Sequence, residues 1–332
     1  CIATPDHWHS VITISALKNG KDVYCEKPLT HNIHESVEVI EAVKKYNRIL
    51  QTGSMQRSSS EFRIACELVR NGVIGKIKNV GIAVGDPGRP CDLPEESPEP
   101  GLNWNLWCGP APLRAYSSVL SPRGIHNHFP AWRNYMEYGG GMVTDWGAHH
   151  IDIAQWGLGT DNSGPIEARP PEDWKKWKSK RGAKLVYSSG TTITHQSGFG
   201  VHFQGEDGDV KVNRGRFVFS LNGKEIAKFE KRGDGSLGSA LQTAEKTFLK
   251  NAKVKLYNSN HHIRDFLSSM ESRKKPITNE IVGGRSAICC HLMNQSYYNG
   301  EAIKWDPKTN TLSEKTGNPD WLTRDYRGIW KV

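Results

Sequence analysis

The sequence predicts an α/β fold in which part of a doubly wound parallel sheet is followed by an α+β domain with a large, mostly antiparallel open sheet. Short strands alternate with helices up to residue 74, which is typical of right-handed βαβ units. Segments that alternate polar and apolar residues dominate 184–220, as expected for antiparallel strands. A long stretch rich in Pro and Gly, residues 85–138, lies between the two patterns.

The first pattern defines a domain over residues 1–74. Asn19-Gly20 and Asn71-Gly72 end two of its helices, because glycine and asparagine adopt the left-handed backbone that stops a helix. We expect a strand end at 1–3, strands at 22–25 and 49–52, and helices at 10–17, 36–46 and 61–69.

The second domain covers residues 75–332. It opens with a longer strand at 76–84, and after the long loop a helix is expected over 139–156. Residues 205–208 read as a hairpin turn. The remaining elements are strands at 184–188, 191–195, 200–204, 209–213 and 216–220, and amphipathic helices at 261–270 and 283–298.

Composition and the distribution of charge argue against a nucleic-acid-binding or membrane-spanning protein. The 332 residues carry a net charge of +9, but Lys and Arg are scattered rather than gathered in a stripe. The densest run, WKKWKSKR at 174–181, could suggest a nucleic-acid patch, yet a solvated surface segment after Pro170-Pro171 explains it better. No apolar run approaches the ~20 residues of a membrane span. We therefore expect neither a nucleic-acid partner nor a membrane span.

Seven cysteines without CxxC spacing indicate reduced or buried thiols, and neither a disulfide framework nor a metal site is expected. The chain opens at Cys1 in what reads as the end of a buried strand. We expect from this that the natural N-terminus, with any targeting peptide, lies upstream.

The stretch GGGMVTDWGAHHIDIAQW, residues 139–156, carries acids and imidazoles at helical spacing. At ~100° per residue, Asp145 and His149 share one face, with Asp152 one turn further on. A carboxylate beside an imidazole can orient it and hold its pKa near ~7, which suits a general acid/base. Two ligands for a metal and a solvated polar face are the alternatives.

Two more constellations follow strand ends. Glu26-Lys27-Pro28 comes directly after one strand, and Pro28 restricts Lys27 and can form a cis peptide bond. The segment from Thr4 to His9 follows another strand. Because ligands of doubly wound sheets lie at the carboxyl ends of the strands, both segments are expected at one cleft.

The long loop contributes a further set of polar and aromatic residues just before the three glycines. Aromatic surfaces beside His, Asn and Arg are typical of sugar and polyol sites, and a loop of this length is usually functional. The candidates for substrate contact are His126, His128, Arg133 and Tyr135.

Taken in order, ATPDHWH, YCEKPLT, QTGSMQR and GGGMVTDWGAHHID resemble the Gfo/Idh/MocA family of NAD(P)-dependent oxidoreductases. The resemblance extends to the closing GGRSAICCHLMNQSYYNG and KWDP. It implies that residues 1–74 are the C-terminal part of a Rossmann dinucleotide-binding domain, and that 75–332 form the family's substrate and oligomerisation domain, whose open sheet mediates a homo-oligomer. It also implies NAD or NADP as cofactor and a carbohydrate or polyol as substrate.

The resemblance implies roles for individual residues as well. Lys27 reaches the cofactor ribose and the reacting hydroxyl, His149 is the acid/base, and Asp145 fixes the tautomer of His149. Arg57 is expected to face the substrate. The cofactor-contacting set is Thr4, Pro5, His9, Glu26, Lys27, Pro28 and Gln56.

One departure and three alternatives stay open. No G-x-G-x-x-G follows a predicted strand, so the residues that select NAD or NADP are expected upstream of Cys1. The alternatives are a glycosidase or lyase that oxidises its sugar transiently, a non-catalytic sugar or dinucleotide sensor, and a metal-dependent hydrolase. Relatives of this pattern are either cytoplasmic or exported folded by a twin-arginine signal, and the sequence does not decide between the two.

Overall fold

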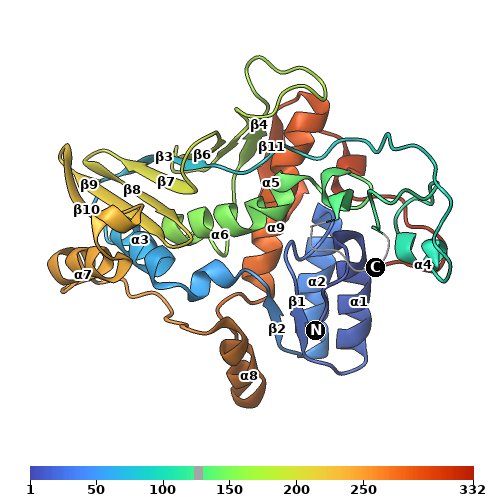
Figure 1. The fold of residues 1–332 in the computed structure, drawn as a ribbon, viewed down its shortest axis with the longest axis horizontal. Coiled ribbons are helices and arrows are strands. Elements are labelled where there is room, and N and C mark those ends of the chain that lie inside the picture. The colour runs from blue at the N-terminus through green and yellow to red at the C-terminus, as the bar shows by residue number, and fades with distance from the viewer. Residues whose placement is uncertain (123–129) are drawn as a thin grey trace.

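The computed structural model describes residues 1–122 and 130–332, and within them the strands form two sheets (Figure 1). The smaller sheet is the parallel pair β1 (Val23–Cys25) and β2 (Leu50–Thr52), and Ile2 adds a parallel bridge to Cys25. The larger sheet has the order β10-β9-β8-β7-β3-β6-β5-β4-β11-β12. Its strands are β3 (Ile77–Ile82), β4 (Glu167–Arg169), β5 (Lys184–Val186), β6 (Thr192–His195), β7 (Val201–Gly205), β8 (Gly208–Asn213), β9 (Arg216–Leu221), β10 (Lys224–Phe229), β11 (Ile303–Asp306) and β12 (Thr311–Leu312).

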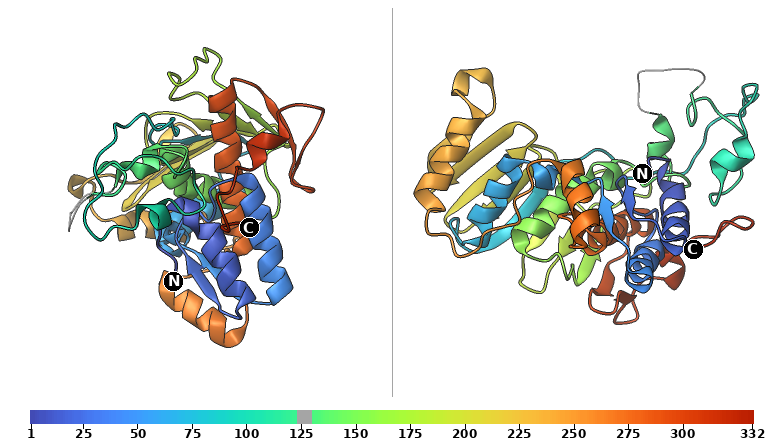
Figure 2. Two further views of the ribbon diagram at one scale, coloured as in Figure 1. Left: turned by 90° about the vertical axis from the view of Figure 1, so that its right-hand side faces the viewer. Right: turned by 90° about the horizontal axis from the view of Figure 1, so that it is seen from below.

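The helices surround these sheets. Figures 1 and 2 place α1 and α2 beside the parallel pair at one end of the molecule, and α7 beside β10 at the opposite end. Their bounds are α1 (Asp6–Lys18), α2 (Ile33–Tyr46), α3 (Ser60–Arg70), α4 (Trp104–Cys108), α5 (Met142–Asp145), α6 (Gly147–Leu158), α7 (Leu237–Phe248), α8 (His262–Ser272) and α9 (Glu280–Asn299). The predicted fold class is confirmed.

The larger sheet is antiparallel except where β3 lies parallel to β6. Helices α3, α6, α7 and α9 contact its strands, and the apolar side chains between them form one core that includes Val80, Ile193 and Phe203. Helix α3 supplies Phe62 and Leu68 to this core, although it lies before residue 74. The domain boundary at 74 stays a prediction, but α3 packs with the larger sheet.

Helix α9 joins the two sheets. It packs against α2 and β2 at its start and against β4 and β5 further along. Two glycines permit the close approach: a Cβ on Gly283 would lie 2.0 Å from Oγ1 of Thr52, and one on Gly284 would lie 2.7 Å from Cδ1 of Ile40. The helix begins at Glu280, three residues earlier than predicted, because the Asn279 side chain caps it by accepting from the amides of Ile281 and Val282.

The predicted helix over 139–156 was wrong in one respect, since it is two helices that meet at Trp146. Gly141, at φ 69°, opens α5, and α6 restarts at Gly147. The sequence analysis also missed several elements: β4, β10, β11, β12, α4 and α7.

Candidate active site

Lys27 and Asp145, predicted from distant parts of the chain, meet in the structure. Lys27 follows β1, and its peptide bond to Pro28 is cis. Its Nζ donates to Oδ1 of Asp145 at 2.5 Å and to the Asp145 backbone carbonyl at 3.0 Å. The side chains are 16% and 13% exposed, so the pair is shielded but not sealed. Because an ammonium has three N–H donors, one is left for a ligand.

The break at Trp146 makes this contact possible. In a continuous helix the Asp145 carbonyl would accept from the amide of His149. Instead, the His149 amide donates to the carbonyl of Trp146 at 3.0 Å, and the Asp145 carbonyl accepts from Lys27. The helix end therefore supplies both a carboxylate and a carbonyl to hold the ammonium.

His149 differs from our expectation. It is 4% exposed, and its Nδ1 has no hydrogen-bond partner among the described residues. Asp145 pairs with Lys27 rather than with the imidazole, so the expectation that Asp145 fixes the tautomer of His149 was wrong. Burial, followed by the positive charges of Lys27 and Arg214, lowers the pKa of His149 well below its ordinary value rather than holding it near 7. The imidazole is neutral at pH 7.

Two further ionisable groups adjoin the pair. Arg133, predicted to contact substrate, places Nε 3.5 Å from Oδ1 of Asp145 and stacks on Trp132. Asp6, at the start of α1, is buried, and the pKa of its carboxyl is raised well above its usual range by burial and by the nearby charge of Asp145.

The predicted cofactor-contacting segments lie at the carboxyl ends of the parallel strands. The hydroxyl of Thr4 and both amide atoms of Gln56 are buried without a hydrogen-bond partner in the described residues. Glu26 lies against Gly53, where a Cβ would be 2.5 Å from its carboxylate. Thr4 and Pro5 also line an apolar cavity of about 480 Å³ with Trp8. Unpaired buried polar atoms are costly, so these atoms are available to a ligand.

His9, which we expect to contact the cofactor, is bonded within the protein, and a cofactor contact stays a prediction. The residue is buried, its Nδ1 lies 2.7 Å from the carbonyl of Pro28, and its Nε2 lies 2.9 Å from the carbonyl of Thr4. Both ring nitrogens are used within the protein. His9 therefore links the two loops that carry Thr4 and Lys27.

Arg57, which we expect to face the substrate, is bound by two acidic side chains, and its contact with a substrate stays a prediction. It is 2% exposed, and all three guanidinium nitrogens donate to the carboxylates of Asp152 and Asp161. Asp152, the third acid of the 139–156 segment, also accepts from the Ser286 hydroxyl. The cluster ties the segment after β2 to α6, and Arg57 and Asp161 border a cavity of about 280 Å³.

Tyr135 packs in the core of the long loop beside Trp132 and Tyr138, and its hydroxyl accepts from Arg89 at 3.2 Å. Burial in this cluster removes it from the expected substrate set. The two candidates His126 and His128 lie outside the described residues, so their role stays a prediction.

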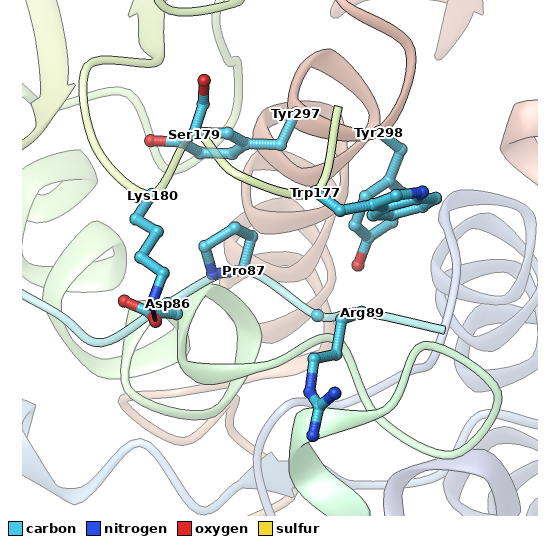
Figure 3. Close-up of a pocket in the computed structure, with 9 residues that line it drawn as sticks. Asp86, Pro87, Arg89, Trp177, Ser179, Lys180, Tyr297 and Tyr298 are labelled. Carbon is cyan, nitrogen blue, oxygen red and sulfur yellow. Dashed lines mark ion pairs between the residues drawn. The ribbon is translucent and has the colours of Figure 1, made fainter. Parts of the chain in front are cut away.

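The basic run at 174–181 borders a separate cavity of about 330 Å³ (Figure 3). Trp177 packs on Tyr298 there, with ring centroids 5.6 Å apart, and Lys180 pairs with Asp86 at 2.8 Å. Arg181 pairs with Asp86 as well. None of the predicted site residues lines this cavity, so it is distinct from the Lys27–Asp145 pair.

Two residues near the site were missed from the sequence. Asp6 stands inside the ATPDHWH motif, and its position at a helix start after a strand end could have drawn attention to it. Arg214 lies in the β8–β9 turn, and its guanidinium stacks on Trp146 at 4.6 Å. No local pattern links that turn to residues 145–149.

Comparison with known proteins identifies the family. The model of an oxidoreductase family's C-terminal alpha/beta domain matches residues 88–332, and the model of its NAD-binding Rossmann fold matches residues 1–54. No helix in the described part of the chain has the length and apolarity needed to cross a membrane.

Curated relatives match a short segment. Myo-inositol 2-dehydrogenase of Thermotoga maritima is 37% identical over 89 residues, 27% of each chain. Levoglucosan dehydrogenase of Pseudarthrobacter phenanthrenivorans is 37% identical over 76 residues, 23% of this chain and 20% of that protein. The 2,7-anhydro-N-acetylneuraminate hydratase of Escherichia coli is 33% identical over 76 residues, again 23% and 20%. The matches thus span about a quarter or less of these relatives.

Solved structures match over most of the chain. Aldose-aldose oxidoreductase from Caulobacter crescentus, complexed with glycerol, aligns over 91% of this chain and 77% of that one, with a TM-score of 0.57 and 18% identity. A levoglucosan dehydrogenase in complex with NADH aligns over 91% and 78%, with a TM-score of 0.56 and 16% identity. At such identities the likeness shows the fold alone. Because the C-terminal family model covers more than half of the chain, this chain belongs to the Gfo/Idh/MocA family of oxidoreductases.

Proposed function

We propose that this protein is an NAD- or NADP-dependent oxidoreductase that interconverts a hydroxyl and a keto group on a sugar, a polyol or a related derivative. The observation that carries the proposal is the Lys27–Asp145 ion pair at the end of β1 and the α5–α6 break, with His149 near enough for the charge of Lys27 to lower its pKa. Family membership and the dehydrogenases among the relatives support it.

The described residues fit the nicotinamide half of a dinucleotide. The partnerless atoms of Thr4 and Gln56 offer hydrogen bonds to it, and Glu26 lies at the same edge of the parallel sheet. When bound, the dinucleotide would supply the hydride acceptor or donor. Nothing in these residues selects between NAD and NADP, and both remain part of the proposal.

The protein groups then handle charge and protons. Lys27 directs its remaining N–H donor at the substrate oxygen and stabilises the alkoxide as it forms. Asp145 holds the ammonium by two hydrogen bonds and so acts as a positioning residue for Lys27. His149, neutral because of burial, accepts the hydroxyl proton on a ring nitrogen.

A second candidate is bond cleavage or hydration through transient oxidation, in which the hydride returns to the product. The presence of a hydratase among the relatives favours keeping it. The same Lys27 and His149 would serve both reactions, since each begins with removal of a hydroxyl proton.

A substrate panel with purified protein tests both candidates by measuring NAD(P)H and product together. Net NAD(P)H equal to product indicates a dehydrogenase, and product without net NAD(P)H indicates the second candidate. Lys27→Ala and His149→Ala are each expected to lose at least ~100-fold in turnover, the typical contribution of a positioned acid or base. Turnover like the wild type in both variants would refute the mechanism.

We also propose a homo-oligomer formed through the larger sheet. Helices α3, α6, α7 and α9 contact strands of this sheet, and polar side chains such as Asn79, Thr192 and Gln204 bond to one another on strands β3, β6 and β7. Light scattering of the wild type and of a Thr192→Arg variant checks this, because a cation placed at the interface should shift the population toward monomer.

A further inference from the structure

Arg214 brings a guanidinium to the candidate active site from the far domain. It occupies the two-residue turn between β8 and β9, where Asn213 pairs with Arg216. Its Cζ lies 4.6 Å from the centre of the Trp146 ring, and Trp146 is the residue at which α5 and α6 meet. The same indole packs against His149, with ring centroids 5.8 Å apart. Arg214 is thus one side chain removed from the proposed base.

This guanidinium has no acidic partner within ion-pair distance among the described residues. Arg216, two positions further on, gives a direct contrast: it stacks on Phe199 at 4.3 Å and also pairs with Glu230 at 3.0 Å. A guanidinium stacked on a ring keeps its in-plane N–H donors free at the edge. Arg214 therefore presents donors next to the site without an acidic partner among the described residues, whereas Arg216 is paired with Glu230.

The charges around the site are unbalanced. Lys27 and Arg133 share the single carboxylate of Asp145, and Arg214 adds a third cation. Glu26 adds a second carboxylate, on whose pKa the charge of Lys27 acts, so three cations face two carboxylates. The positive charges of Lys27 and Arg214 both lower the pKa of His149, so both cations lie near this imidazole. A site with excess positive charge and an unpaired guanidinium favours an anionic ligand.

We infer that the substrate carries a carboxylate, as in a sugar acid, and that Arg214 binds this group while Lys27 faces the reacting hydroxyl. This inference rests on the proposed function and names its substrate class. A carboxylate matches the planar N–H edge of the guanidinium in a bidentate contact, and a lysine cannot reproduce that geometry. Arg214 is then a specificity-determining residue.

The kinetic test compares hexuronates with neutral sugars and polyols. D-glucuronate and D-galacturonate are run against D-glucose and myo-inositol with NAD or NADP. For the uronates, Arg214→Ala is expected to lower kcat/KM by about 10- to 100-fold, mainly through KM, since a charge-assisted hydrogen bond is lost. Neutral substrates should change by less than about threefold. Arg214→Lys should recover only part of the loss.

Arg216→Ala is the matched control, because it removes a stacked arginine from the same hairpin and should leave the preference unchanged. An equal loss on uronates and neutral substrates in Arg214→Ala would overturn the inference, as would an equal effect of Arg216→Ala. A wild-type preference for glucose 6-phosphate over glucuronate would overturn the assignment of a carboxylate.

A binding measurement separates this inference from the proposed function. D-glucuronate is titrated into wild type, Arg214→Ala and Arg216→Ala, and binding is followed by ligand-observed NMR, which needs no turnover. Binding that is lost only in Arg214→Ala supports the inference even if no sugar is oxidised, a result that would refute the proposed function alone. Equal binding to wild type and Arg214→Ala would refute the inference whatever the activity.

Discussion

Two ion-paired clusters flank the start of α6, and they differ in what they leave unused. Arg57, Asp152 and Asp161 form a buried cluster in which all three guanidinium nitrogens have acceptors. Lys27 and Asp145 form a partly exposed pair in which the ammonium keeps one free donor. An ion pair therefore stabilises the fold in the Arg57 cluster, whereas the Lys27–Asp145 pair leaves an ammonium donor available to a substrate.

The comparison teaches how to separate a structural ion pair from a site. Spacing placed Asp145 and Asp152 on the same stripe of the 139–156 segment, with Asp145 beside His149 and Asp152 one turn further on. The two acids differ in their hydrogen-bond partners and in their exposure. Asp152 is wholly buried and accepts from Arg57 and Ser286, whereas the Asp145 side chain is 13% exposed. Substitutions in the first cluster should affect stability, and those in the second should affect turnover.

The largest effect is expected for Arg57→Ala. Removing the guanidinium leaves the carboxylates of Asp152 and Asp161 without their cation, and breaking a buried pair from one side typically costs ~3–5 kcal/mol. The free energy of unfolding, measured by urea titration, should fall by that amount. Arg216→Ala is the control, since its exposed pair with Glu230 should contribute no more than ~1 kcal/mol. Equal losses in the two variants would show that the Arg57 cluster is not the structural one.

A smaller effect, on turnover, is expected for Asp145→Asn. The variant keeps the size of the side chain but removes the charge that holds Lys27 at 2.5 Å, so kcat should fall by about 10- to 100-fold. The melting temperature should stay within a few degrees of the wild type. Asp152→Asn should show the reverse pattern, with a lowered melting temperature and little change in kcat. If both variants lost stability alone, the distinction between the clusters would fail.

The smallest effect is expected for the dependence of kcat/KM on pH. Because the pKa of His149 is lowered, its neutral, proton-accepting form persists as pH falls through 6.5. The kcat/KM for alcohol oxidation should change less than about twofold between pH 8 and 6.5, and fall only below that range. The pH profile of the wild type, measured beside His149→Ala, checks this. An acidic limb centred at or above pH 6.5 that vanishes in the variant would contradict it.

Much of the fold could be predicted because its signals are local. Helix α2 shows apolar periodicity, Asn or Gly stands at the ends of α2 and α9, and β7 and β8 alternate over five or six residues. The strands β4 and β12 are only three and two residues long, too short for a pattern, and they exist through pairing with β11. Whether such short segments form strands depends on the neighbouring strands with which they can pair.

The candidate active site also has some features that the sequence predicts and others that it does not. The sequence by itself determined the order of the motifs, and with it the family, the presence of Lys27 at a strand end and the acids and imidazoles near residue 145. The tertiary structure decided which of these groups meet: that Asp145 holds Lys27 rather than His149, that Arg57 and His9 are consumed by internal contacts, and that Arg214 reaches Trp146. The physical reason is that hydrogen-bond saturation and burial depend on side chains more than a hundred residues apart, whose approach no local spacing records.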